Sequence, residues 1–73
     1  MTNAEKNLKF FKAQVSSIKR QIKEAKKDLA EAEKTGEVAK IEKERNNLLR
    51  LEKSLSVNID IVALSQKVVN GEI

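Results

Sequence analysis

The chain has 73 residues, 36% of them charged, and carries a formal net charge of +4. A core this small rarely supplies more than about 3–5 kcal/mol of stability without a disulfide, a metal or another copy of the chain. Cysteine and histidine are both absent, which excludes disulfides, a thiol nucleophile, and the commonest metal ligand and general base. We therefore expect no cofactor and no metal site, and self-association remains as the source of extra stability.

The composition is typical of long helices, because proline is absent and glycine occurs only at Gly36 and Gly71. Residues 1–6 lack the apolar stretch of a secretory signal, and no apolar run reaches the ~20 residues needed to span a bilayer. We expect a cytoplasmic protein with no membrane partner.

The first predicted arm covers about residues 3–34. Its apolar residues occupy two positions of a seven-residue repeat over about four heptads, which indicates a helix with one coiled-coil seam. Asn3 is predicted to cap the start, and Gly36 to follow the end. The seam residues are Ala4, Leu8, Phe11, Val15, Ile18, Ile22, Ala25, Leu29 and Ala32.

The second predicted arm covers about residues 37–70. Residues 54–60 are rich in Ser, Asn and Asp, which form caps and turns, so a break near 56–59 would leave a short third helix. The seven-residue spacing continues through this segment and favours an unbroken arm. The spaced residues are Ile41, Leu48, Leu55, Val62 and Val69.

A chain reversal is predicted at residues 35–36. The step from Leu29 to Ile41 is 12 residues, so the repeat shifts register, and Gly36 lies within that step. One continuous helix would instead place Gly36 in its seam. We predict a single all-α domain over 1–73, an antiparallel two-helix hairpin with coiled-coil-like packing. In such a hairpin, residue i lies near residue 71 − i.

A second apolar stripe appears at the open end of the predicted hairpin. It makes this end of the second arm apolar over more than half its circumference, which one partner helix cannot cover. Phe10 lies outside the first seam, and the pairing of residue i with residue 71 − i places it beside Ile61 of this stripe. We expect a homo-oligomer, first of all a dimer, that forms a four-helix bundle or a larger helical assembly. A different protein is the alternative occupant. The stripe comprises Val57, Ile61, Leu64 and Val68.

Positive charge is concentrated in residues 6–27, whose net charge is +7. Some of these cations point away from the seam, where a row of them can follow a phosphate backbone and Phe10 can stack on an unpaired base. The alternative is a solvated face that keeps the helix soluble. The candidate nucleic-acid contacts are Lys6, Lys9, Phe10, Arg20, Lys23 and Lys27.

In architecture, this arrangement resembles the Rop-type plasmid repressors, and the opening Met1-Thr2…Glu5-Lys6 is also similar. The later heptads are not. The resemblance implies a hairpin that dimerises into a four-helix bundle and binds RNA across its first helices.

The sequence contains no phosphate-binding loop, zinc-ligand spacing or nucleophile elbow. We predict a non-enzymatic helical interaction protein that self-associates and binds a protein partner, as an adaptor, assembly factor or inhibitor of the kind that phage or mobile-element genes encode. The alternative is an RNA- or DNA-binding helical bundle that uses the basic face of its first helix.

Overall fold

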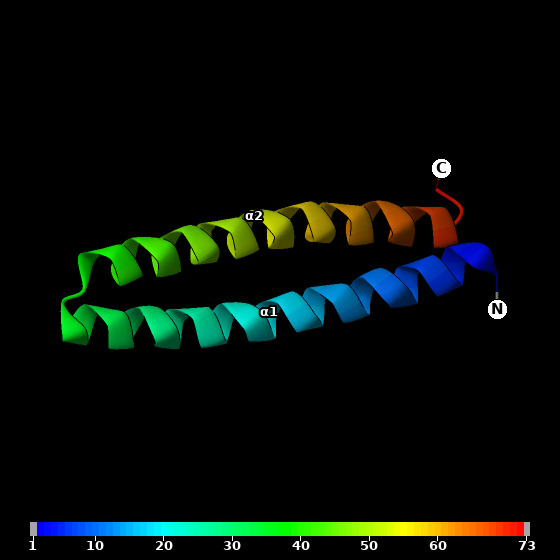
Figure 1. Cartoon of the computed structure of the whole chain (residues 1–73). Helices are drawn as coiled ribbons and strands as arrows, with labels where there is room; N and C mark the ends of the chain where they lie inside the picture. Colours follow the sequence, from blue (N-terminus) through cyan, green and yellow to red (C-terminus); the bar gives the residue numbers. More distant parts are fainter. Residues whose placement is uncertain (1, 73) are drawn as a thin grey trace.

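A computed structural model describes residues 2–72 and shows two α-helices, α1 (Asn3–Thr35) and α2 (Val38–Val69). The helices lie side by side and run in opposite directions, so both chain ends lie at one end of the molecule (Figure 1). The hairpin measures 52 × 17 × 12 Å. The predicted all-α hairpin is therefore confirmed.

The start of α1 differs from the prediction, because Thr2 and not Asn3 is the N-cap. The Glu5 backbone N–H donates to Thr2 Oγ1 at 3.2 Å, and the Thr2 backbone N–H donates to Glu5 Oε1 at 3.3 Å. This reciprocal pair is a capping box, whose sequence signature is Thr followed three residues later by Glu. Asn3 is the first helical residue instead.

The turn between the helices depends on Gly36, which has a left-handed φ of 75°. The Gly36 N–H donates to the Ala32 carbonyl at 3.1 Å, and the Thr35 hydroxyl donates to the same carbonyl at 2.8 Å. Glu37 then takes an extended conformation and α2 begins. These contacts satisfy a carbonyl that the helix end would otherwise leave unpaired.

Helix α2 continues through residues 54–60, so the alternative with a short third helix does not form. Asn58 is half-buried on the side facing α1, and its Nδ2 donates to the Ser54 carbonyl at 2.8 Å. Because this amide bonds to the helix's own backbone one turn earlier, it does not interrupt the helix.

Both helices contribute to the core, in which the fully buried side chains belong to α1 and the apolar repeat of α2, for example Leu48 and Leu55, is half-buried. Within α2, all of which the structure describes, no residue is fully buried. Side-chain hydrogen bonds within residues 2–72 join residues no more than four apart, so apolar packing holds the two helices together. The buried residues of α1 are Leu8, Ile18, Ile22, Ala25 and Ala32.

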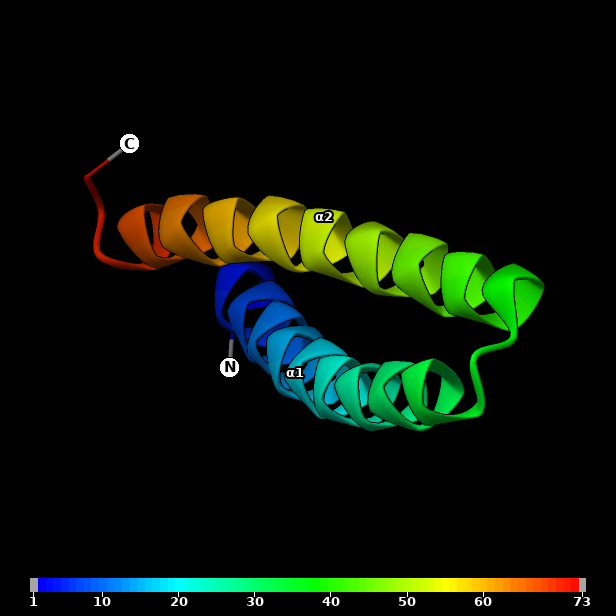
Figure 2. The ribbon, with the colours of Figure 1, turned by 90° about the vertical axis from the view of Figure 1, so that its left-hand side faces the viewer.

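The two helices cross at an angle instead of running parallel (Figure 2). Inclined axes are normal when the side-chain ridges of one helix pack into the grooves of another. Within residues 2–72, neither helix contains a stretch that is both long enough and apolar enough to cross a membrane.

Candidate interaction site

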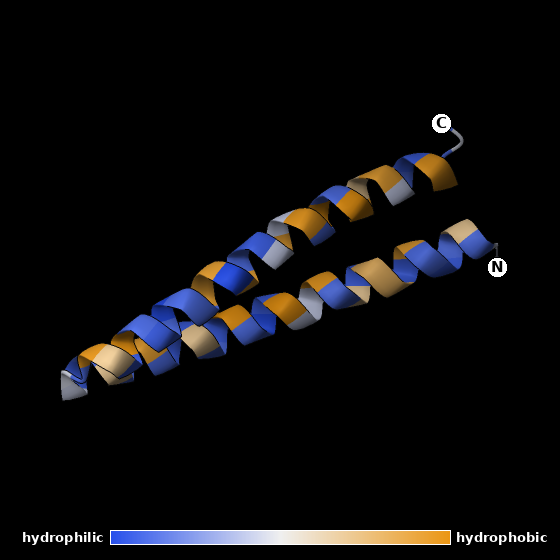
Figure 3. Cartoon of the chain, turned by 45° about the horizontal axis from the view of Figure 1, so that its top comes forward, coloured by the Kyte–Doolittle hydropathy of each residue, from blue (hydrophilic) through white to orange (hydrophobic). Residues whose placement is uncertain are grey.

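The most distinctive surface of the molecule is the outer stripe, which we define as Val57, Ile61, Leu64 and Val68 of α2. Val57 is 54% exposed, Leu64 57% and Val68 44%, whereas Ile61 is half-buried. Hydrophobic colouring gathers on α2 towards its C-terminal end, whereas the half nearer the turn is mainly hydrophilic (Figure 3). The structure therefore leaves the predicted interface residues of α2 largely uncovered.

Phe10 lies on the same face of the hairpin as the outer stripe. Val68 and Ser65 of α2 line an open cavity of about 250 Å³ with Ala4 and Asn7 of α1. This cavity shows which side of α1 adjoins the outer stripe. Phe10 follows Asn7 by three residues, a spacing that places both on one side of a helix. The first helix thus contributes a large apolar side chain to this face.

The Phe10 ring is 57% exposed, although it contacts its neighbour Phe11. The two ring centroids are 5.3 Å apart, and the ring planes make an angle of 79°. Edge-to-face contact is a favoured aromatic arrangement. Phe11 is half-buried, in keeping with its predicted place in the seam. Phe10 therefore contacts a residue of the seam but is not covered by the seam.

The opposite flank of the hairpin has a smaller cavity, and Ile59 beside it is 45% exposed. Lys12 and Val15 of α1 line a small cavity of about 120 Å³ with Ile59 and Val62 of α2. Leu49 is 64% exposed, and it lies away from the outer stripe in the other half of α2. It is an isolated apolar side chain, of a kind that normal surfaces tolerate.

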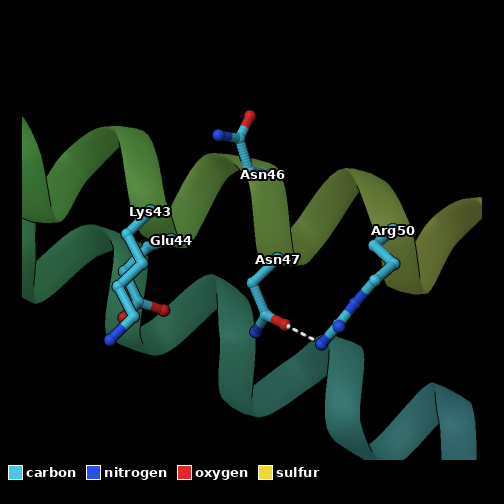
Figure 4. Close-up of a pocket in the computed structure, with 5 residues that line it drawn as sticks. All are labelled: Lys43, Glu44, Asn46, Asn47 and Arg50. Carbon is cyan, nitrogen blue, oxygen red and sulfur yellow. Dashed lines mark hydrogen bonds between the residues drawn. The ribbon is translucent and has the colours of Figure 1, made fainter.

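A polar groove lies nearer the turn, and the sequence reasoning missed it. It has a volume of about 450 Å³ and is lined by Lys43, Glu44, Asn46, Asn47 and Arg50. Arg50 donates to Asn47 Oδ1 at 3.0 Å, and both side chains extend towards α1, whereas Asn46 points away (Figure 4). The sequence did contain one signal. Glu44 precedes Leu51 by seven residues, so a charged residue occupies the heptad position that an apolar residue fills one repeat later.

The predicted cations of α1 are all exposed but do not form one continuous row. Lys6 and Lys9 lie near the N-terminus, and the other three lie beyond Ala13 and Ser16. Arg20 lines a groove of about 310 Å³ that also includes two carboxylates. The structure thus divides the basic face into two groups, of which the second adjoins negative charge. These groups are Lys6 and Lys9, and then Arg20, Lys23 and Lys27, with Glu24 and Asp28 in the groove beside Arg20.

Comparison with protein-family models, with curated proteins and with solved structures found no match to this chain. Within residues 2–72, no group of three or more acidic side chains is placed to hold a metal ion. The features of the chain that can indicate a function are therefore the surfaces of the hairpin itself.

Proposed function

We propose that this protein is a non-enzymatic helical interaction protein, which self-associates through the outer stripe and Phe10 and then binds a protein partner as an adaptor, assembly factor or inhibitor. The observation that carries the proposal is the exposure of the outer stripe on a helix that has no fully buried residue of its own. Soluble monomers rarely expose contiguous apolar patches without a binding role.

Energetics support the proposal. Complete burial of a Val, Leu, Ile or Phe side chain contributes about 1.5–3 kcal/mol. The outer stripe and Phe10 forgo roughly half of this in a single hairpin, whose small core is marginal. Covering these side chains by association would therefore stabilise the fold together with the assembly.

A protein partner has a separate surface available. The polar groove near the turn is lined by both signs of charge, and it lies in the half of α2 that precedes the outer stripe. Polar, mixed-charge rims suit reversible protein recognition, in which charges set specificity. Self-association and partner binding can therefore occupy opposite ends of α2.

The proposal is tested by sedimentation equilibrium of the wild-type protein, Leu64→Asp and Leu49→Asp. Both leucines are exposed residues of α2, but only Leu64 belongs to the outer stripe. We expect the wild type and Leu49→Asp to be oligomeric and Leu64→Asp to be a helical monomer. A well-folded monomer in the wild type, or equal loss of mass in both variants, would refute self-association through this surface.

Nucleic-acid binding is the second candidate function. It is favoured by the exposure of Arg20, Lys23 and Lys27, which follow one another at helical spacing on the outside of α1. Cations in such a row neutralise phosphates and release counterions, so affinity falls steeply with salt.

The test is RNA and DNA binding measured against salt concentration for the wild type and for Arg20→Glu/Lys23→Glu. A matched control, Lys40→Glu/Lys43→Glu, makes the same change of charge on α2. Selective loss of binding in the first variant is expected. A salt-independent signal, or the same loss in both variants, would reject this function.

A further inference from the structure

The spacing of the outer stripe matches its own reverse. Its residues are separated by four, three and four positions, so the pattern is unchanged when the helix is turned end for end. In an antiparallel pair of such helices, Ile61 meets Leu64 of the second copy, and Val57 meets Val68 of the second copy. These two contacts include every residue of the stripe, and each contact occurs twice about a twofold axis.

We propose that the occupant of the outer stripe is a second copy of this chain, bound α2 to α2 in antiparallel orientation about a twofold axis between Ile61 and Leu64. The inference rests on the proposed self-association and specifies its geometry. It also assigns Asp60 and Lys67 as the residues that set orientation.

Charge along one border of the stripe agrees with this orientation. Asp60 and Lys67 immediately precede Ile61 and Val68, and both side chains are exposed. In the antiparallel pair, Asp60 faces Lys67 of the second copy, and the reciprocal pair forms on the other side of the axis. A parallel pair would set Asp60 against Ser65 of the second copy and gain no ion pair, because flanking residues pair differently in parallel coiled coils.

The other border of the stripe faces α1 and is uncharged. It is formed by Asn58 and Ser65, both half-buried. Because the pair is antiparallel, the α1 helices of both copies lie on this same side. Phe10 of each copy then covers the flank where these helices approach, so the first helix closes the interface.

The polar half of α2 requires the two hairpins to overlap only at their open ends. Full side-by-side overlap would bring the polar groove, with Lys43, Glu44 and Arg50, into the interface, where unpaired charges are costly. With the axis between Ile61 and Leu64, the turns point in opposite directions. The distance between the two turns is then about 80 Å, from about 27 residues on each side of the axis at 1.5 Å per residue.

A charge-exchange experiment tests the pairing directly. Asp60→Lys places Lys against Lys67 at both pairs, and Lys67→Asp places Asp against Asp60 at both pairs. Mixing the two variants creates a heterodimer in which both pairs are again of opposite sign. Because two attractive pairs of modest energy become two repulsive ones, we expect each variant alone to dimerise roughly tenfold more weakly than the wild type. The mixture should regain wild-type affinity as a heterodimer.

The matched controls are Glu42→Lys and Lys40→Asp, which change the same charges on exposed residues of α2 near the turn. We expect no change of dimerisation in either control, alone or mixed. A wild-type oligomer whose affinity is unaffected by Asp60→Lys, or is not regained in the mixture, would overturn this geometry while leaving self-association intact. A monomeric wild type at high concentration would overturn both.

Discussion

The rings of Phe10 and Phe11 meet edge to face, with centroids 5.3 Å apart. Neighbouring side chains on a helix diverge by about 100°, so two adjacent Phe residues cannot both enter one narrow seam. Phe11 enters it, and Phe10 contacts the Phe11 ring edge to face while remaining largely exposed. One residue therefore stabilises the hairpin, whereas the other is available to whatever covers the hairpin.

This division predicts different effects of truncation. Phe11→Ala should lower the free energy of unfolding by about 2 kcal/mol, because a half-buried aromatic side chain leaves the seam. Phe10→Ala should lower it by only about 0.5 kcal/mol in dilute solution, the scale of one edge-to-face contact, but should weaken association. Denaturant unfolding at low concentration and sedimentation at high concentration separate the two effects. Equal destabilisation by both substitutions would contradict the division.

Among residues 2–72, Ala32 is the most completely buried residue of the core, with 0% exposure. Ala32→Leu should destabilise the protein by about 1–3 kcal/mol, because the larger side chain has no space against α2. Ala30→Leu is the matched control, since Ala30 is exposed on the same turn of α1. Alanine and leucine have similar helix propensities, so the control should change stability by less than about 0.5 kcal/mol. Denaturant titration of both variants provides the measurement.

The left-handed conformation of Gly36 predicts a backbone effect without a steric one. Within the described part of the chain, a Cβ at Gly36 would meet no atom within 4 Å. Gly36→Ala should nevertheless cost about 1–2 kcal/mol, because an L-residue is disfavoured at this φ. Gly36→Asn should cost less. The control is Gly71→Ala, which has a similar φ of 76° but follows the end of α2 instead of joining the two helices. The measurement is thermal unfolding. A larger loss of stability in Gly71→Ala than in Gly36→Ala would contradict this explanation.

Asn58 predicts a stabilising substitution. A polar residue at a seam position reduces stability but helps to specify register. Asn58→Leu should therefore raise the free energy of unfolding by about 1 kcal/mol, whereas Ser56→Leu on the exposed side should change it little. Chemical denaturation compares the two variants. A loss of stability in Asn58→Leu would mean that the hydrogen bond from the Asn58 side chain to the Ser54 carbonyl contributes more than the apolar contact that replaces it.

The fold was largely predictable because it follows from a repeat. A seam that recurs every seven residues identifies Ile18 and Ile22 as core residues, and its shift of register at Gly36 locates the turn. The cap was predicted one residue late, because Asn3 is itself a good cap and only the pairing of Thr2 with Glu5 distinguishes the two. A hydrophobic pattern does not show which of two adjacent candidate caps makes the local hydrogen bonds.

The surfaces were predictable only in part. The outer stripe was identified from its spacing, but the polar groove was not, because Glu44 and Asn47 occupy inward-facing positions that a seam normally fills with apolar residues. The cations of α1 were treated as one face. Glu24 and Asp28 follow Arg20 at steps of four, so spacing within α1 already places these three side chains next to one another. Only the α2 side of the groove, which Asn47 and Arg50 line, requires the position of the second helix.

The most direct test of the account is small-angle X-ray scattering of the wild-type protein at a concentration where sedimentation shows one assembly. A twofold pair of hairpins that overlap through the outer stripe should give the mass of a dimer and a maximum dimension of about 80 Å, estimated from helix rise. A dimer no longer than the 52 Å of one hairpin would contradict the overlap at the open ends. A particle with the mass and length of one hairpin would contradict self-association itself.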